Sequence, residues 1–587
     1  MTGSMRLAAV ALGLLFPLLP HTSDFVRSVY ALELPEGASG IAPKPLVKAK
    51  KHMVVAAHPL AAEAGLAMLR QGGSAVDAGI ATQMVLNLVE PQSSGIGGGA
   101  FMLYWDAAAR KLTSYDGRET APASATPELF LNADGKPLPK DEVIITGLSV
   151  GEPGVLAALK LMHDKYGKLP WAELFQPAIT LARDGFPVSP RLAKMLAEKA
   201  PETFTPEARA YFFDDAGRPW PAGYKLTNPA LADTFALIAR EGTKPFYEGD
   251  IARDIVASVQ NDPRRPGGLT QEDLAKYRAK KREPICTSYR DYRVCGMGPP
   301  SSGAVAVSQV LGMIEPFDLG SEPLQLRATH LIAEAQRLAY ADRARYLADP
   351  DFVAVPMGGL LDAGYLAERR ALIDPDRAQA EVKAGSPPDM QHGSFGLDRS
   401  KESGGTSQIS VIDAEGNAFS MTTSIESAFG ARSMVRGFLL NNQLTDFSFE
   451  SADAEGRPIA NRVEGGKRPR SSMDPTIVFD EDGAPAYVLG SPGGPAIIFF
   501  NLKALIALID WGLDPAQAAA LGNFGSTEDR FLLETGTGLD QLATGLAAMG
   551  HEVKRMPLTS GLHIIAVTPE GLEGGADPRR EGVALGD

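Results

Sequence analysis

One junction constrains this chain more than any other feature of its sequence. The polar residues Glu402-Ser403-Gly404-Gly405 end at Thr406, where an alternating strand pattern begins and runs to Asp413. The two glycines let the backbone bend, as attack of the Thr406 hydroxyl on the Gly405 carbonyl would require. Cutting that bond would give Thr406 an α-amino group with a pKa of about 7.7–8.0, suited to act as base for its own hydroxyl. An ordinary loop-to-strand junction would contain the same residues, so the rest of the chain must decide.

Composition excludes several classes of partner. The 587 residues suffice for one large domain or several closely joined ones, and 44% hydrophobic with 22% charged residues is ordinary for a globular protein. A formal net charge of -14 argues against a nucleic-acid-binding or anionic-membrane surface. The eight histidines are scattered without metal-ligand spacing, so we predict no metal and no other cofactor.

The first residues predict export. Arg6 precedes an apolar run, residues 7–20, that is too short to span a bilayer. Val29-Tyr30-Ala31 is a small-residue cleavage site, so we assign residues 1–31 to a signal peptide and expect a periplasmic or secreted protein. A buried N-terminal helix is the alternative. No later segment has the character of a membrane span, and we expect no stable membrane anchor.

The two cysteines, Cys286 and Cys295, flank a predicted hairpin. If Arg290-Asp291 form a two-residue turn, the cysteines face each other on antiparallel strands, with Cβ atoms about 4.5–5.5 Å apart. An exported protein would permit a disulfide there. Two free thiols on one face of the hairpin fit the sequence equally well.

The glycine-rich stretch at residues 91–100 predicts a close backbone contact. It follows a helical pattern at 75–88, capped by Ser74, and leads into a strand pattern at 101–105. Phosphate-binding glycine loops instead open a helix whose N-terminus faces the anion. We therefore expect this stretch to lie against other backbone and not to bind a nucleotide.

A second motif offers a different class of enzyme. Gly147-Leu148-Ser149-Val150-Gly151 matches the nucleophile elbow of α/β-hydrolases, with residues 143–146 in the place of the preceding strand. That elbow needs a helix directly after the serine, whereas Pro153 and Gly154 delay the helical pattern to Val155. No βαβ series surrounds it, so we do not favour this serine-hydrolase interpretation.

The chain changes character at Thr406. Helical patterns dominate residues 155–390, and the polar, glycine- and serine-containing stretch at 382–403 predicts an exposed linker. After Thr406, strand pairs are predicted at 407–413 with 418–424, and at 476–480 with 486–489. The order favours an α+β fold in which helices cover layered sheets.

The second predicted hairpin leads into Gly490-Ser491-Pro492-Gly493-Gly494, which opens an apolar helical run at 496–511. Backbone N–H groups at such a glycine-rich helix start can stabilise a developing oxyanion. Gly493 and Gly494 are therefore candidates for that role.

Together these pieces resemble the gamma-glutamyltransferase (glutathione hydrolase) family of N-terminal-nucleophile hydrolases. The likeness covers about Val54 to Gly582. Each motif alone is weak, but their order around Thr406 is specific. The motifs are Pro91-Gln92-Ser93-Ser94-Gly95-Ile96-Gly97-Gly98-Gly99, Gly117-Arg118-Glu119, Pro300-Ser301-Ser302-Gly303, Leu439-Leu440-Asn441-Asn442-Gln443, Lys467-Arg468-Pro469-Arg470-Ser471-Ser472-Met473, Gly490-Ser491-Pro492-Gly493-Gly494 and Asp577-Pro578-Arg579.

The resemblance implies a four-layer αββα sandwich built from two autoproteolytic fragments. Cleavage between Gly405 and Thr406 would give a large fragment, residues 32–405, and a small catalytic fragment, residues 406–587, which stay together as a heterodimer. Thr406 would be the nucleophile and its amine the base. Ser424 stands where the family usually has a threonine that hydrogen-bonds the nucleophile. Gly493 and Gly494 would form the oxyanion hole.

The resemblance also implies a substrate class, glutathione and other γ-glutamyl compounds, with water or an amino acid or peptide as acceptor. Arg118, Ser471 and Ser472 would hold the substrate α-carboxylate. Gln443 and Asp446 would hold its α-ammonium. An arginine with hydroxyls suits the anion, and a carboxylate suits the cation.

The chain departs from the family pattern beside the ammonium site. Glu426 stands where many members have asparagine, and residues 447–466 form a shorter stretch than in members with a substrate lid. Glutaryl-cephalosporin acylases share the fold and the motif order, and their substrates lack the α-amino group. Asp446 and Glu426 argue against such a substrate, because two carboxylates facing an uncharged methylene would repel each other. A matured but catalytically silent binding protein is a further alternative, against which the intact Thr406 speaks.

Overall fold

The computed structural model describes Met1 and residues 36–388, 390, 395–400, 402, 404–527 and 530–587. The predicted signal peptide, residues 1–31, lies outside the described residues apart from Met1. Among the described residues, no helix combines the length and the apolar character that crossing a membrane requires.

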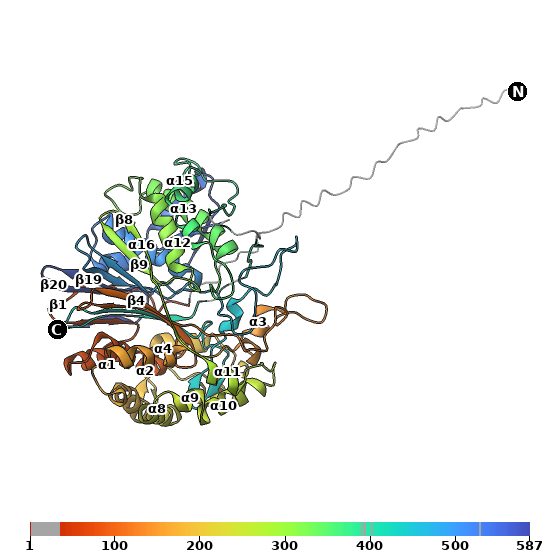
Figure 1. Cartoon of the computed structure of the whole chain (residues 1–587), viewed down its shortest axis with the longest axis vertical. Coiled ribbons are helices and arrows are strands. Elements are labelled where there is room, and N and C mark those ends of the chain that lie inside the picture. Colours follow the sequence, from red (N-terminus) through yellow and green to blue (C-terminus); the bar gives the residue numbers. More distant parts are fainter. Residues whose placement is uncertain (2–35, 389, 391–394, 401, 403, 528–529) are drawn as a thin grey trace.

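Two seven-stranded sheets lie face to face in the middle of the molecule (Figure 1). In order across the first sheet the strands are β1 (Val47–Ala49), β20 (Gly571–Ala576), β19 (His563–Thr568), β15 (Pro485–Leu489), β14 (Thr476–Phe479), β9 (Tyr292–Gly296) and β8 (Ile285–Tyr289). Across the second they are β21 (Val583–Gly586), β2 (Met53–Ala56), β10 (Thr406–Ile412), β11 (Ala418–Ser424), β3 (Gly99–Asp106), β4 (Lys111–Gly117) and β7 (Lys280–Arg282).

Helices cover the outer face of each sheet (Figure 1). The layer on the second sheet contains α1 (Pro59–Arg70), α2 (Ala75–Val89), α4 (Val155–Tyr166), α5 (Gln176–Asp184) and α8 (Pro229–Glu241). The layer on the first contains α12 (Gly303–Ile314), α13 (Leu326–Tyr346), α16 (Ile497–Ile509) and α17 (Pro515–Ala520). The predicted αββα sandwich is confirmed.

Shorter elements complete the chain. The remaining helices are α3 (Lys140–Val143), α6 (Pro190–Ala197), α7 (Pro206–Phe212), α9 (Lys244–Tyr247), α10 (Asp250–Gln260), α11 (Gln271–Lys276), α14 (Met357–Leu360), α15 (Ala363–Arg370) and α18 (Ala543–Ala548). The remaining strands are β5 (Phe186–Pro187), β6 (Lys225–Leu226), β12 (Met434–Val435), β13 (Phe438–Leu439), β16 (Phe524–Ser526), β17 (Phe531–Glu534) and β18 (Val553–Met556).

Strand β10 shows how the sequence builds two cores. Ile409 and Val411 join the apolar cluster under the α1–α2 layer, whereas Ile412 faces the cluster between the two sheets. This alternation follows from the two-residue period of a strand. The Ser410 hydroxyl, also on the inter-sheet side, donates to the His563 carbonyl of β19 at 2.9 Å. Both faces of β10 are therefore fixed by packing, which positions its first residue.

The sequence prediction of helix α2 and its cap is confirmed. The Ser74 hydroxyl accepts from the Asp77 N–H, and the Asp77 carboxylate accepts from the Ser74 N–H. This reciprocal pair satisfies N–H groups that a helix leaves open at its start. Every residue of α2 is buried, because the helix lies between strand β10 and the outer helices.

The cysteine hairpin is also confirmed, as strands β8 and β9 with Cys286 opposite Cys295. The two residues form a disulfide, so of the two alternatives left open by the sequence the bonded one holds.

One expectation from the sequence was wrong. Residues 382–403 are not an exposed linker throughout, since Asp398 and Glu402 are buried. Their carboxylates are drawn inward because Arg470 pairs with both of them. The strand that the disfavoured serine-hydrolase interpretation needs before Ser149 is absent from that stretch, where the short helix α3 ends at Val143 and Gly147–Ser149 form a 3-10 turn.

The packing of α2 on β11 predicts that a larger side chain at Gly79 would destabilise the folded protein. A Cβ atom at Gly79 would lie 2.4 Å from Cε1 of Phe419. Alanine favours a helix over glycine by about 1 kcal/mol, but overpacking a core costs roughly 1–3 kcal/mol. We therefore expect Gly79→Ala to lower the midpoint of thermal unfolding, and Phe419→Leu to recover part of the loss in the double variant.

Gly312→Ala in α12 is the matched control for that experiment. Its Cβ would meet Cδ1 of Leu366, the end of a flexible side chain, at 2.7 Å. Because this side chain can move aside, the control should be close to neutral. A Gly79→Ala protein that melts above the wild type would contradict the packing account.

Candidate active site

Thr406 is the first residue of β10 and lies buried opposite Ser424, the last residue of β11. The Ser424 hydroxyl accepts a hydrogen bond from the Glu426 N–H at 2.8 Å. The same hydroxyl donates to the carbonyl oxygen of Gly405, with 2.5 Å between the two oxygens. A donor at this oxygen polarises the carbonyl of the peptide bond before Thr406, the bond that the sequence marks for cleavage.

Backbone-to-backbone approaches surround this peptide bond. A Cβ atom at Gly405 would lie 2.0 Å from the Glu426 carbonyl oxygen, and one at Gly98 would lie 2.1 Å from the Ser424 carbonyl oxygen. A Cβ atom at Gly97 would meet the carbonyl oxygen of Leu439 at 2.1 Å. Only glycine fits at these points. The expected close backbone contact of residues 91–100 is confirmed.

A buried cation lies beside the carbonyl of Thr406. Arg580 donates from Nη1 to the Thr406 carbonyl oxygen at 3.4 Å and pairs with Glu36 at 2.9 Å. Arg191 pairs with the same Glu36 and with Glu90. Burial and the neighbouring Arg191 lower the pKa of Arg580 to about 10, so it stays charged at neutral pH. A cation at this position disfavours protonation of an amine formed on Thr406.

The glycine loop between β15 and α16 adopts conformations that other residues avoid. Gly493 has φ 143° and Gly494 has φ 56°. A Cβ atom at Gly490, where the loop begins, would lie 2.3 Å from Oε1 of Gln408, two residues beyond Thr406. The loop therefore packs against the start of β10. The assignment of Gly493 and Gly494 to an oxyanion hole remains a prediction.

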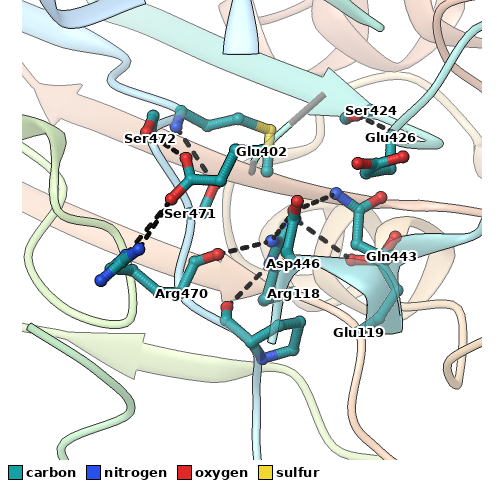
Figure 2. A network of polar contacts seen from close by, with 12 residues as sticks. Arg118, Glu119, Glu402, Ser424, Glu426, Gln443, Asp446, Arg470, Ser471 and Ser472 are labelled. Carbon is teal, nitrogen blue, oxygen red and sulfur yellow. Dashed lines mark hydrogen bonds and ion pairs between the residues drawn. The ribbon is translucent and has the colours of Figure 1, made fainter. Parts of the chain in front are cut away.

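The residues predicted to clamp a zwitterion meet in one buried cluster (Figure 2). Arg118, directly after β4, pairs with Asp446 at 2.5 Å, and the Gln443 side chain donates to the same carboxylate at 3.2 Å. Arg118 is held further by the Pro469 carbonyl oxygen. In this uncut chain the predicted anion-binding and cation-binding groups neutralise each other.

A carboxylate of the chain itself occupies the other half of the cluster (Figure 2). The Ser472 hydroxyl donates to Glu402 at 2.8 Å, and Arg470 and Arg343 both pair with that carboxylate. Burial opposes ionisation of Glu402, but the two guanidinium groups outweigh it and hold its pKa at about 2. The hydroxyl of Ser471 instead accepts from the Met473 N–H.

Glu426 adopts a left-handed backbone conformation with φ 77°, which is uncommon for residues other than glycine. Its carboxylate accepts from the N–H and the hydroxyl of Ser427. The other carboxylate oxygen lies 3.7 Å from the Lys140 ammonium at the start of α3. Glu426 thus has a cationic neighbour that the sequence analysis did not identify.

Three further site residues escaped sequence reasoning: Glu402, Arg343 and Lys140. Glu402 stands in a stretch that reads as a linker, and Arg343 lies within the long helical pattern at 326–347. Lys140 belongs to none of the motifs found in the sequence. Of the two arginines that pair with Glu402, only Arg470 lies in a motif that the sequence had singled out, Lys467-Arg468-Pro469-Arg470.

Two other chemistries find less support. The Ser149 hydroxyl donates to the Thr146 carbonyl oxygen at 2.7 Å within its turn, so the strand-to-helix elbow is not formed. Among the residues that the structure describes, the one group able to hold a metal is His330, Glu334 and His551. The two rings already contact each other at 2.7 Å, and Arg337 pairs with Glu334. The absence of a metal stays a prediction.

The αββα sandwich, with a threonine at the start of a central strand and a polarised peptide bond before it, defines an N-terminal-nucleophile hydrolase. A sequence model of the gamma-glutamyltranspeptidase family matches residues 61–587. The chain belongs to this family, and the resemblance seen in its motifs is confirmed.

Individual relatives agree. The chain is 38% identical to the glutathione hydrolase proenzyme of Bacillus subtilis (strain 168), over 92% of each chain. It is 37% identical to the corresponding proenzyme of Escherichia coli (strain K12), over 91% of each. Among solved structures, a cephalosporin acylase from Bacillus halodurans aligns with a TM-score of 0.82 at 29% identity, covering 94% of this chain and 99% of that one.

The buried Glu119 beside Arg118 predicts a pH-dependent stability. Burial raises the pKa of Glu119 to about 8, from about 4.5 in the unfolded chain. Between these pH values the unfolded chain releases the proton while the folded chain keeps it, so the free energy of unfolding falls as pH rises. The contribution of the protonated Glu119 is fully present only below about pH 4.5. Glu119→Gln should therefore flatten the thermal unfolding midpoint as a function of pH between about pH 5 and pH 8.

Asp482→Asn, at an exposed carboxylate, serves as the control for this measurement. Some slope should remain in the Glu119→Gln protein, because burial also raises the pKa values of Glu152 and Asp474 to about 7. Parallel curves for the wild type and Glu119→Gln would show that Glu119 does not titrate as argued.

Proposed function

We propose that this chain is a glutathione hydrolase and gamma-glutamyltransferase proenzyme that cuts itself between Gly405 and Thr406. The observation that carries the proposal is the Ser424 hydroxyl donating to the Gly405 carbonyl oxygen, opposite Thr406. The cut yields a large fragment, residues 32–405, and a small one, residues 406–587, which remain one heterodimer because β10 pairs with β2 of the large fragment.

Maturation uses the same atoms as the later reaction. The Thr406 hydroxyl attacks the Gly405 carbonyl carbon, the C–N bond to Thr406 breaks, and the Thr406 nitrogen takes up the proton. The Gly405 acyl group then forms an ester with Thr406, which water hydrolyses. Ser424 stabilises the negative charge on the Gly405 oxygen during the attack.

The mature enzyme transfers a γ-glutamyl group. The free amine of Thr406 takes the proton of its hydroxyl, whose oxygen attacks the γ-carbonyl of glutathione or another γ-glutamyl amide. Gly493 and Gly494 donate to the oxyanion. The γ-amide C–N bond breaks, the amine departs with the proton, and water or an amino acid or peptide amine then resolves the ester.

Substrate binding exchanges ion pairs within the cluster. Removal of Glu402 from Ser472 after the cut makes room for the substrate α-carboxylate, which Arg118, Ser471 and Ser472 then hold. The α-ammonium binds Asp446, Gln443 and Glu426, so that it takes the place of Arg118 at the Asp446 carboxylate. Arg118 and Asp446 thus each exchange their mutual ion pair for one with the substrate, so neither is left as an unpaired buried charge.

We also propose that the protein is exported to the periplasm or beyond. The Cys286–Cys295 disulfide supports this, because such bonds persist in oxidising compartments. A matured but catalytically silent binding protein is disfavoured, since Thr406, Gly493 and Gly494 are all present.

Thr406→Ala tests the proposal most simply. The variant should remain one uncut chain and release no glutamate from glutathione, because it lacks the hydroxyl required for both steps. Thr406→Ser should still be cut. The measurements are denaturing electrophoresis and glutamate release. A Thr406→Ala protein that is cut and active would contradict the proposal. Loss of activity in Ser149→Ala with normal cleavage would favour a serine hydrolase instead.

A further inference from the structure

The carboxylate of Glu36 is connected to Thr406 through a single side chain. Glu36 is buried and pairs with Arg580 at 2.9 Å, and Nη1 of that guanidinium also donates to the Thr406 carbonyl oxygen at 3.4 Å. Among the described residues, Glu36 is the only carboxylate that forms an ion pair with Arg580. It belongs to none of the motifs found in the sequence, and the proposed reaction does not use it directly.

The N-terminal strap, residues 36–44, holds this carboxylate in place. It runs along residues 578–582, whose carbonyl oxygens accept from two N–H groups of the strap, each at 3.0 Å. The Lys44 ammonium at the end of the strap donates to the Arg580 carbonyl oxygen at 2.6 Å. The backbones that carry Glu36 and Arg580 are therefore fixed to each other, so that their ion pair is part of the fold.

A second guanidinium group shares the Glu36 carboxylate. Arg191 on α6 pairs with Glu36 and, at 3.1 Å, with Glu90. The Glu90 carboxylate accepts at 2.8 Å from the hydroxyl of Ser407, which directly follows Thr406. The charged side chains of this network are buried, so solvent screens them weakly. Two guanidinium groups thus face two carboxyl groups, and loss of Glu36 would leave an excess of positive charge beside the nucleophile.

This charge balance bears on the amine that cleavage would form on Thr406. The amine must be neutral to take the proton of the hydroxyl, and a free α-amino group has a pKa of about 7.7–8.0. A neighbouring cation lowers that pKa, which favours the neutral amine but weakens it as a base, and a neighbouring carboxylate does the opposite. Arg580 and Glu36 form one ion pair beside this residue, so the balance between them affects the pH at which the amine titrates.

The remaining charged groups around Thr406 are held by partners within the chain. They are Glu426 with Lys140, Arg118 with Asp446, Glu402 with Arg470, Asp577 with Arg579, and Glu581 with the Arg191 N–H. Burial raises the pKa of Glu90 and lowers that of Lys44 to about 8. His563 on β19 is uncharged at neutral pH, because burial lowers its pKa to about 3. None of these groups needs to be changed to test Glu36.

We propose that Glu36 is a positioning residue for the nucleophile: it holds Arg580 at the Thr406 carbonyl, offsets its charge, and thereby sets the pH above which the Thr406 amine works as a base. The inference rests on the proposed function, because only the cut chain has this amine. In the heterodimer, the strap of the large fragment would supply a charge that acts on the nucleophile of the small fragment.

The test is the pH profile of kcat/KM on matured protein with L-γ-glutamyl-p-nitroanilide, since its acid limb reports the pKa of the base in the free enzyme. Glu36→Gln removes a negative charge and should move the acid limb to lower pH by about one unit. Arg580→Gln removes a positive charge and should move it to higher pH by about as much. In the double variant both charges are absent, so the limb should lie close to that of the wild type.

Two further variants separate the charge of Glu36 from its packing. Glu36→Asp keeps the charge, so its acid limb should stay at the wild-type pH even where its rate falls. Glu63→Gln removes an exposed carboxylate from α1, and solvent and salt screen such a charge. It should leave both the acid limb and the rate unchanged.

Each outcome decides. An acid limb that does not move in Glu36→Gln, or that moves in the same direction in Glu36→Gln and Arg580→Gln, overturns this inference and leaves the proposed function standing. A wild-type protein that is not cut, or that does not turn over the γ-glutamyl donor, refutes both. If Glu36→Gln does not mature, the double variant is compared with Arg580→Gln. Loss of the Glu36 charge should then still move the limb to lower pH, and an unmoved limb overturns the inference.

Discussion

The antiparallel pairing of β10 with β11 is the constraint on which the rest of the site depends. It places Thr406 opposite Ser424, whose hydroxyl accepts from the Glu426 N–H and donates to the Gly405 carbonyl oxygen. Two close backbone contacts that only glycine permits, at Gly98 and Gly405, keep this geometry. A hydrogen bond is electrostatically stronger in a buried, low-dielectric environment than in water. In our proposal this geometry selects one peptide bond and one hydroxyl for reaction.

Charge compensation links maturation to recognition. A buried charge without a partner costs several kcal/mol, so the uncut chain pairs Arg118 with Asp446 and supplies Glu402 to Arg343 and Arg470. In our proposal the carboxylate of the segment before the cut stands in for the substrate carboxylate until cleavage frees it. In the same proposal Arg118 stabilises the precursor by pairing with Asp446 and later binds the donor carboxylate. Lys140 at Glu426 extends this logic to the ammonium side of the pocket.

Local patterns could be predicted from the sequence, whereas long-range pairing could not. The capping box at Ser74, the hairpin that joins Cys286 to Cys295 and the alternation of β10 each follow from neighbouring residues, and the structure contains all three. The burial of Glu402 could not be foreseen, because a polar glycine-containing stretch is typical of a linker and its arginine partners lie in distant elements. Lys140 escaped for the same reason: a single lysine at a short helix gives no periodic signal, and its partner becomes visible only in the folded chain.

Trapping the acyl-enzyme tests the central claim most directly. Matured protein is mixed with glutathione and quenched in acid within one turnover, and the small fragment is digested and mapped by mass spectrometry. The account predicts a single γ-glutamyl group, labile to mild base as an ester is, on the peptide that begins with Thr406. A γ-glutamyl group on any other residue, or a small fragment that begins elsewhere, would contradict it.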